Sequence, residues 1–300
     1  MAGDPGAVLV TGGGGGMGLA CAGHFAPHYP LVLADVDEER LGAAAAKLEG
    51  AGPAVRTVVC DVSEAADVER LGAMLAEAGE LAAIVHTAGL SSSMGTGRRI
   101  VEVSLQGTAR VLEATLPLAG EDTVAVCVAS ISGHRRRSAE FDRLLLDPLR
   151  DDLVTELEAA GDGGELPGSV GYSLSKRGVI QLVEVEARRW GERGARIVSI
   201  SPGVVDTPMG QRELGTNAAG LIALSAMGRI GHTDDIVAAV AYACSPEASF
   251  LTGCDIRLDG GTVPTFAHHS EQADREVWDD PWKAAARSAE LAAQAAADNA

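Results

Sequence analysis

The stretch TGGGGGMG, residues 11–18, is the strongest indication of the fold because it joins a β-branched apolar run to a helical pattern. Glycines at such a junction permit a tight turn and let the backbone approach a pyrophosphate, which binds at the helix N-terminus. The flanking patterns favour a nucleotide-binding loop over a flexible linker. The spacing is ambiguous: TGxxxGxG uses Gly12, Gly16 and Gly18, GxxGxxG uses Gly12, Gly15 and Gly18, and GxGxxG uses Gly13, Gly15 and Gly18.

Outward from this loop, short apolar runs alternate with longer Ala- and Leu-rich helical patterns. Apolar strands separated by helices are typical of a parallel sheet covered on both faces. We therefore expect an α/β fold, a doubly wound parallel sheet of the Rossmann type in three layers and a single domain. The expected strands are Ala7–Val10, Leu31–Asp35, Thr57–Asp61, Leu81–Ala88, Val124–Ala129, Arg196–Ser201 and Asp255–Leu258.

The expected domain covers residues 1–261, and two segments of the chain do not follow the alternation of strands and helices. Residues 134–169 form an insertion with a helical stretch around 141–160. Its apolar stripe must be buried, against a neighbouring subunit or as a wall over a substrate pocket. Residues 262–300 form a C-terminal extension, partly helical or flexible, in which Asp280-Pro281-Trp282 is typical of a helix start. The stripe consists of Phe141, Leu144, Leu145, Leu149, Leu153 and Leu157.

Composition excludes several classes of function. A formal net charge of −18 makes nucleic acid and anionic membranes poor partners. The 5 cysteines have no metal-type spacing, and there is no HExxH or GxSxG motif, so we expect no metal site and no hydrolase elbow. The sequence has neither the basic start of a signal peptide nor an apolar run of about 18 residues, the length of a membrane-spanning helix. We therefore expect a cytoplasmic location.

Acidic residues follow the second and third expected strands. Asp35 lies close to the offset of about 20 residues at which a carboxylate binds the adenosine ribose hydroxyls. No Arg or Lys is expected beside Asp35 or in the glycine loop to neutralise a 2′-phosphate, so the predicted cofactor is NAD rather than NADP. At the end of the third strand, Asp61 and Val62 offer a carboxylate and a backbone amide for the adenine ring.

The sequence YSLSK, residues 172–176, places Tyr172 and Lys176 on one face of a helix. A phenol is a poor base at neutral pH, but a nearby ammonium and an oxidised nicotinamide both favour the phenolate. Lowering the pKa by about 3 units takes about 4 kcal/mol, which a cation at ~4 Å with an effective dielectric of ~20 supplies. This pair is therefore the predicted catalytic centre.

Taken together, these motifs make the chain similar to the compact branch of the short-chain dehydrogenase/reductase family, over about residues 7–261. Ala88-Gly89 resembles the end of the NNAG motif, with His86-Thr87 in place of the two Asn. Ser130–Gly133 resembles the SxxG motif, Pro202–Thr207 the PGxVxT segment, and Leu258–Gly261 the DGG ending.

The resemblance implies roles for these residues. Tyr172 would exchange a proton with the substrate oxygen, which Ser130 polarises, while Lys176 would lower the Tyr172 pKa and bind the nicotinamide ribose. Hydride would pass between nicotinamide C4 and the carbinol carbon. The partners implied are a small-molecule alcohol or ketone and other copies of the chain, in a dimer or tetramer. The cofactor-binding set is Gly12, Gly16, Met17, Gly18, Asp35, Asp61, Val62, Ala88, Gly89, Tyr172, Lys176, Pro202, Gly203, Val205 and Thr207, with Thr207 on the carboxamide.

The chain also departs from the family pattern. Ser104 stands where the family has a catalytic Asn that helps to hold a water in the proton relay. Either the backbone carbonyl of Ser104 still holds this water, or the relay is impaired. His86 is interpreted as a packed strand-end histidine. The long insertion resembles that of bacterial 3α-hydroxysteroid dehydrogenases. Pocket walls are expected from Ser91–Met94, Met209 and Leu214, and their few charges favour a bulky apolar substrate.

Two alternatives remain open. An extended-branch sugar-nucleotide epimerase or dehydratase is allowed by the GxxGxxG spacing, but the PGxVxT segment, the DGG ending and the short C-terminal part argue against it. A non-enzymatic NAD-responsive scaffold is allowed by Ser104. Such a protein would have no need of Ser130, Tyr172 and Lys176 together.

Overall fold

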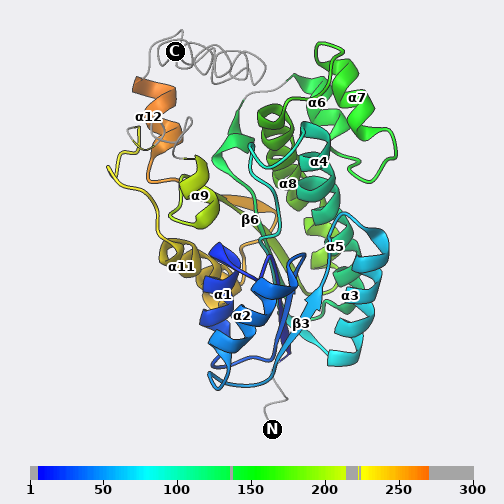
Figure 1. Cartoon of the computed structure of the whole chain (residues 1–300), viewed down its shortest axis with the longest axis vertical. Coiled ribbons are helices and arrows are strands. Elements are labelled where there is room, and N and C mark those ends of the chain that lie inside the picture. The colour runs from blue at the N-terminus through cyan, green and yellow to red at the C-terminus, as the bar shows by residue number, and fades with distance from the viewer. Residues whose placement is uncertain (1–5, 136–137, 214–221, 223, 270–300) are drawn as a thin grey trace.

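A seven-stranded parallel sheet with helices on both faces forms the molecule (Figure 1). The computed structural model describes residues 6–135, 138–213, 222 and 224–269. The strand order is β3-β2-β1-β4-β5-β6-β7, so the winding reverses between β1 and β4, where the carboxyl edge of such a sheet binds ligands. The strands are β1 (Ala7–Thr11), β2 (Leu31–Asp35), β3 (Val55–Val59), β4 (Leu81–His86), β5 (Val124–Val128), β6 (Arg196–Pro202) and β7 (Cys254–Leu258).

The predicted fold class is confirmed, and the strand bounds agree to within two residues. Shifts of two residues occur at the end of β4, which is His86 rather than Ala88, and at both ends of β3, which begins at Val55 rather than Thr57. β3 is an edge strand with exposed Arg56 and Thr57, so its start carries no continuous apolar signal.

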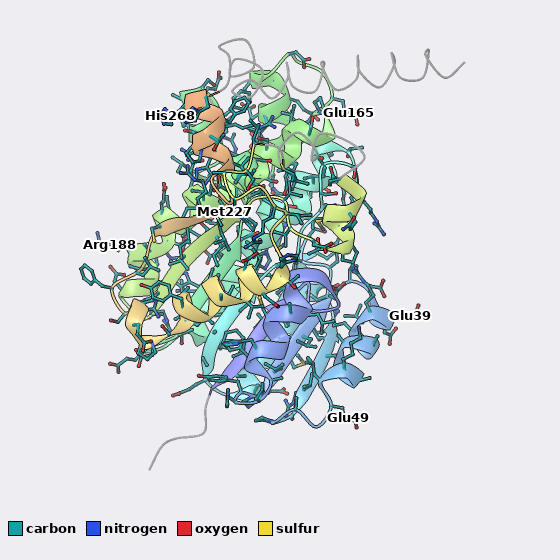
Figure 2. The ribbon with its side chains drawn as sticks, turned by 90° about the vertical axis from the view of Figure 1, so that its left-hand side faces the viewer. Glu39, Glu49, Glu165, Arg188, Met227 and His268 are labelled. Atoms are coloured by element: carbon teal, nitrogen blue, oxygen red, sulfur yellow. The ribbon has the colours of Figure 1, made fainter. Side chains whose placement is uncertain are left out.

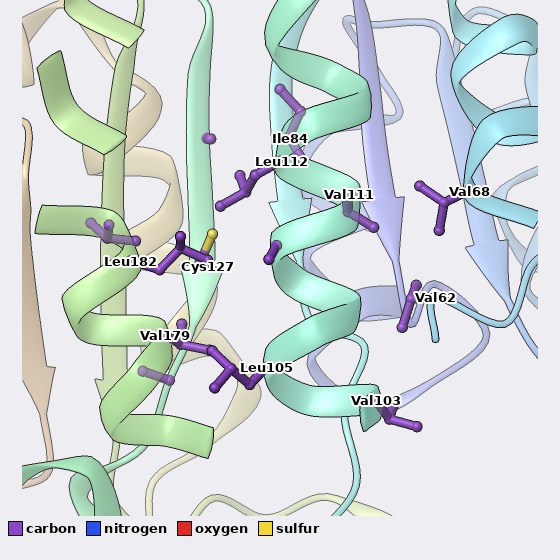
Figure 3. Close-up of a cluster of buried hydrophobic side chains, with 14 of the residues drawn as sticks. Val62, Val68, Ile84, Val103, Leu105, Val111, Leu112, Cys127, Val179 and Leu182 are labelled. Carbon is purple, nitrogen blue, oxygen red and sulfur yellow. The ribbon is translucent and has the colours of Figure 1, made fainter. Parts of the chain in front are cut away.

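Alternate strand residues divide the core between the two faces of the sheet. Val8 and Val10 pack with α1 (Gly16–Phe25), α2 (Glu38–Leu48) and α11 (Thr233–Cys244). Leu9 packs on the opposite face with α3 (Ala65–Ala78), α5 (Gly107–Thr115) and α8 (Gly168–Gly191). Figure 3 shows part of this second cluster, in which α5 lies between the side chains of α8 and those near α3.

The expected helical stretch around 141–160 is two short helices, α6 (Ala139–Leu144) and α7 (Leu153–Ala160), rather than one. Its stripe is buried in this chain's own core, so neither a neighbouring subunit nor a pocket is needed to cover it. Arg177 of α8 pairs with Asp142 at 3.0 Å, and Gln106 donates to the carbonyl of Pro148. Leu149 is the exception in the stripe, since it is 39% exposed.

The remaining helices lie near the carboxyl edge of the sheet. α4 (Gly97–Val101) runs through a π-helical turn, Glu102–Gln106, into α5. α9 (Pro208–Glu213) follows β6, and α12 (Thr262–His269) follows β7 (Figure 1). The expected helix start at Asp280-Pro281-Trp282 lies outside the described residues.

Charged side chains gather at the outside of the molecule. Glu39, Glu49 and Arg188 are exposed and project from the periphery of the molecule in Figure 2. Among the described residues, no helix combines the length and apolar character needed to span a bilayer.

Candidate active site

The backbone of the glycine loop fits the TGxxxGxG spacing. Gly12 and Gly16 have backbone φ angles of +67° and +54°, which residues that carry a side chain rarely adopt. A Cβ on Gly18 would lie 2.3 Å from the carbonyl oxygen of Gly12. At Gly15 a Cβ would meet nothing within 4 Å, so the structure does not favour GxxGxxG or GxGxxG, which both use Gly15, over TGxxxGxG. Gly14 is crowded too, since a Cβ there would lie 2.9 Å from Asp35 Oδ2. Since no side chain caps the start of α1, its first N–H groups remain available to a pyrophosphate.

Asp35 lies at the carboxyl end of β2, buried beneath this loop. One carboxylate oxygen accepts the N–H of Gly14 at 3.0 Å, and the other accepts a guanidinium N–H of Arg40 at 2.8 Å. The expectation that no cation lies beside Asp35 is therefore wrong. Arg40 comes from the first turn of α2, which folds back over the strand end, and its side chain is 55% exposed at the groove.

The carboxylate of Asp61 is held by neighbours inside the expected adenine site. Ser63 donates to one oxygen through its N–H and hydroxyl, and Arg99 of α4 donates to the other at 2.7 Å. Burial alone would raise the pKa of Asp61, but these bonds outweigh it and hold the pKa below its usual value. Arg99 lines the same groove, and sequence reasoning missed it.

The two predicted hydroxyls, Ser130 and Tyr172, meet in one pocket. Ser130 follows β5, and its oxygen accepts the N–H of Ser132 at 3.2 Å. Its hydroxyl also bonds to the Tyr172 oxygen, and that bond favours the phenolate. The bond from the Ser132 amide therefore holds the Ser130 oxygen in the pocket beside Tyr172.

Lys176 and Ser104 lie beside one another next to Gly89. A Cβ on Gly89 would lie 3.3 Å from Ser104 Oγ and 3.6 Å from Lys176 Nζ. The ammonium donates to the carbonyl of Val128 at 2.8 Å, and burial lowers the pKa of Lys176 to about 8. Ser104 Oγ accepts the N–H of Leu90 at 3.0 Å. The carbonyl of Ser104, expected to hold a relay water, already accepts the hydroxyl of Thr108 at 2.9 Å.

The pKa of Tyr172 is raised, whereas the sequence predicts that Lys176 and an oxidised nicotinamide would lower it. Burial raises it, the bond from Ser130 lowers it, and the charge of Glu213 raises it further, leaving the pKa above its usual value. Lys176 Nζ lies 5.9 Å from the centroid of the Tyr172 ring and does not offset the cost of burial. Tyr172 is therefore a protonated phenol at neutral pH.

His86 is a packed strand-end histidine, as interpreted from the sequence. Its ring is 2% exposed and bonds to the hydroxyls of Thr11 at 2.8 Å and Thr108 at 2.9 Å. Burial, followed by the charge of Lys176, lowers the pKa of His86 to about 3, so the ring is neutral. Because the Thr108 hydroxyl donates to Ser104, Nε2 of His86 must be the donor to Thr108.

A groove and a pocket meet at the carboxyl edge of the sheet. The groove runs from Asp35 and Asp61 past the glycine loop to Ala88 and Gly89. The pocket holds Ser130 and Tyr172, and the two cavities share Met17, Thr207 and Met209. Pro202, Gly203 and Val205 line the pocket rather than the groove. Gly18 is buried beneath the loop, and Val62 lines the groove beside Asp61.

The pocket walls are only partly those expected. Ser91, Ser92 and Met209 line the pocket, whereas Leu214 lies outside the described residues. Two charged side chains, Glu213 and Arg135, also line it, which corrects the expectation of few charges there. No spacing signal could have found Glu213, because it meets Ser92 from 121 positions away.

Comparisons with known proteins agree with this geometry. A family model for short chain dehydrogenases matches residues 6–140, and one described as enoyl-(acyl carrier protein) reductase matches residues 156–263. The chain is 32% identical to D-threitol dehydrogenase of Mycolicibacterium smegmatis, covering 84% of this chain and 91% of that protein. It is 29% identical to 3beta-hydroxysteroid dehydrogenase 1 of Eggerthella lenta, covering 85% and 92%. The crystal structure of levodione reductase superposes with a TM-score of 0.69 at 28% identity, covering 88% and 99%.

The chain belongs to the short-chain dehydrogenase/reductase family. It is accordingly an oxidoreductase of the class that acts on alcohols and ketones with a nicotinamide cofactor and small-molecule substrates.

Proposed function

We propose that this protein is an NAD-dependent oxidoreductase that interconverts a secondary alcohol and a ketone carrying a bulky apolar skeleton. The observation that carries the proposal is the pairing of Ser130 and Tyr172 in a pocket continuous with the glycine-loop groove. A nicotinamide dinucleotide fits this groove, since glycines stand where a Cβ would meet backbone and the start of α1 is uncapped.

In the proposed mechanism, the glycine loop and Asp35 would hold a nicotinamide dinucleotide, which would supply the hydride chemistry at the carbinol carbon. Ser130 polarises the substrate oxygen, and Tyr172 exchanges the proton with it. During reduction the protonated phenol donates, so the raised pKa of Tyr172 suits this direction. During oxidation the phenolate must form first, and cationic charge at the site favours it. Lys176, held by the carbonyl of Val128, supplies such a charge and would bind the nicotinamide ribose.

Asp35 supports NAD over NADP. Its buried carboxylate lies at the ribose end of the groove and is fixed by Gly14 and Asp37 N–H groups as well as by Arg40. A 2′-phosphate would have to approach this anion. Arg40 reduces the repulsion without removing it, because half of its side chain faces solvent.

The apolar lining of the pocket supports the substrate class. Ile131, Val204, Val205 and Met209 offer hydrocarbon surface beside Tyr172. The names of the relatives support both an apolar and a polar substrate, since one relative is named for a hydroxysteroid and another for the polyol threitol. The test is a screen of NAD⁺ and NADP⁺ reduction over steroid, terpenoid, acyl-chain and polyol alcohols. Turnover of apolar secondary alcohols with NAD⁺ is expected, and turnover confined to polyols or to nucleotide sugars would overturn the proposal.

Other parts of the proposal rest on separate features. A reducing, cytoplasmic setting is supported by the cysteines, which are all free thiols with a pKa raised chiefly by burial. A homo-oligomer is supported by the apolar side chains of Leu146 and Val185, each about half exposed around the cavity between α5 and α8. One catalytic domain over residues 1–261, with an extension beyond it, remains our proposal for the chain's organisation.

A further inference from the structure

A carboxylate lies in the wall of the pocket that holds the two reacting hydroxyls. Glu213 ends α9 and lines the pocket with Ser130 and Tyr172. Serines of the loop between β4 and α4 donate to both of its oxygens, Ser92 Oγ to Oε2 at 3.0 Å and Ser93 Oγ to Oε1 at 2.5 Å. The carboxylate is therefore held at a fixed place in the wall.

Glu213 carries a full negative charge at neutral pH. Burial alone would raise its pKa, but the hydroxyls of Ser93, Ser91 and Ser92 outweigh that effect and hold the pKa below its usual value. The charge reaches the reacting end of the pocket, because it raises the pKa of Tyr172. A charged hydrogen-bond acceptor thus stands within electrostatic range of the group that exchanges the substrate proton.

The serines leave the carboxylate able to take a new partner. Ser91 Oγ and Ser93 Oγ also bond to each other at 3.4 Å, so either hydroxyl can turn away from Glu213 and keep a partner. A purely apolar substrate would cover this charge without bonding to it, which is unfavourable. A substrate with a second donor group would cover it and replace the lost hydrogen bond.

We propose that Glu213 is a substrate-specificity residue that accepts a hydrogen bond from a second donor on the substrate, a hydroxyl or an ammonium group a few bonds from the reacting carbinol. This inference rests on the proposed alcohol–ketone activity. It narrows the substrate class to apolar skeletons that carry one further donor.

The experiment measures kcat/KM with NAD⁺ for cyclohexanol, for cyclohexane-1,2-, 1,3- and 1,4-diol, and for 4-aminocyclohexanol. The ratio of each donor-bearing alcohol to cyclohexanol is compared between wild type and Glu213→Gln. Removing the charge from one charged hydrogen bond should reduce the best ratio about tenfold or more. The diols and the amine separate the two kinds of donor.

Ser93→Ala is the matched control, because it removes one support of the carboxylate and keeps its charge. It should lower kcat/KM for all the alcohols by similar factors and leave the ratios within about threefold. The inference is overturned if wild type shows no preference for any donor-bearing alcohol, or if Glu213→Gln retains that preference. If wild type oxidises neither these alcohols nor those of the wider screen, the proposed function itself fails, and this inference fails with it.

Discussion

At the scale of single residues, we propose that Asp35 sets the preference for NAD over NADP. Asp35→Asn keeps a hydrogen-bond acceptor and removes the charge that opposes a 2′-phosphate. We expect wild type to bind NAD at least tenfold more tightly than NADP, a difference of about 1.4 kcal/mol, and the variant to lose most of that preference. Calorimetry with both cofactors measures it.

Asp37→Asn is the control for this prediction, since Asp37 also pairs with Arg40, at 3.1 Å, but does not line the groove. It should keep the preference for NAD. Equal or tighter binding of NADP by wild type would contradict the assignment and would give Arg40 the role of a phosphate ligand.

In the proposed mechanism, Tyr172 also governs the pH dependence of the reaction. Since burial and the charge of Glu213 raise its pKa, the phenolate needed for oxidation forms only on the alkaline side, and kcat/KM for oxidation should rise with pH. Glu213→Gln removes a negative charge and thereby favours the phenolate, so the rising limb should move to lower pH. A limb that stays in place or moves upward would show that Glu213 does not act on Tyr172.

At the scale of elements, the junction of β1 and α1 depends on glycine at particular positions. Gly18→Ala places a Cβ 2.3 Å from the Gly12 carbonyl, which forces the loop to move. Cofactor affinity should fall at least tenfold by calorimetry. Gly23→Ala, later in α1 with only Leu48 Cδ2 within 4 Å, should retain affinity. Equal affinities in the two variants would contradict the loop geometry.

Substitutions at two leucines of the insertion test whether its apolar stripe is part of this chain's core. Leu153 is fully buried and Leu149 is 39% exposed. Leu153→Ala should reduce the free energy of unfolding by about 2–5 kcal/mol, while Leu149→Ala should reduce it by less than about 1 kcal/mol. Chemical denaturation measures both. Equal small effects would indicate that the stripe is not part of this chain's core.

At the scale of the whole molecule, the sequence predicted the sheet, its winding and the positions of Ser130 and Tyr172, because apolar alternation and short motifs are local signals. It could not choose among the glycine spacings, since the choice depends on contacts with Thr87 and the Gly12 carbonyl. The sequence does not reveal the roles of Arg40 and Glu213, because only the folded chain brings Arg40 to Asp35 and Glu213 to the serines of the loop after β4. The sequence pattern also does not show which surface buries the apolar stripe of the insertion. It suggests another subunit or a pocket wall, whereas in the structure α8 and the rest of this chain's core bury it.

We propose that Tyr172 performs proton transfer in an alcohol–ketone reaction that uses a nicotinamide cofactor. The most direct measurement compares wild type and Tyr172→Phe for NAD⁺ reduction with the best alcohol of the screen, together with NAD⁺ affinity by calorimetry. We expect kcat to fall by about 10² or more in Tyr172→Phe, while the affinity for NAD⁺ changes less than about threefold. Substantial residual turnover by Tyr172→Phe, in an assay shown to be free of wild-type enzyme, would contradict it.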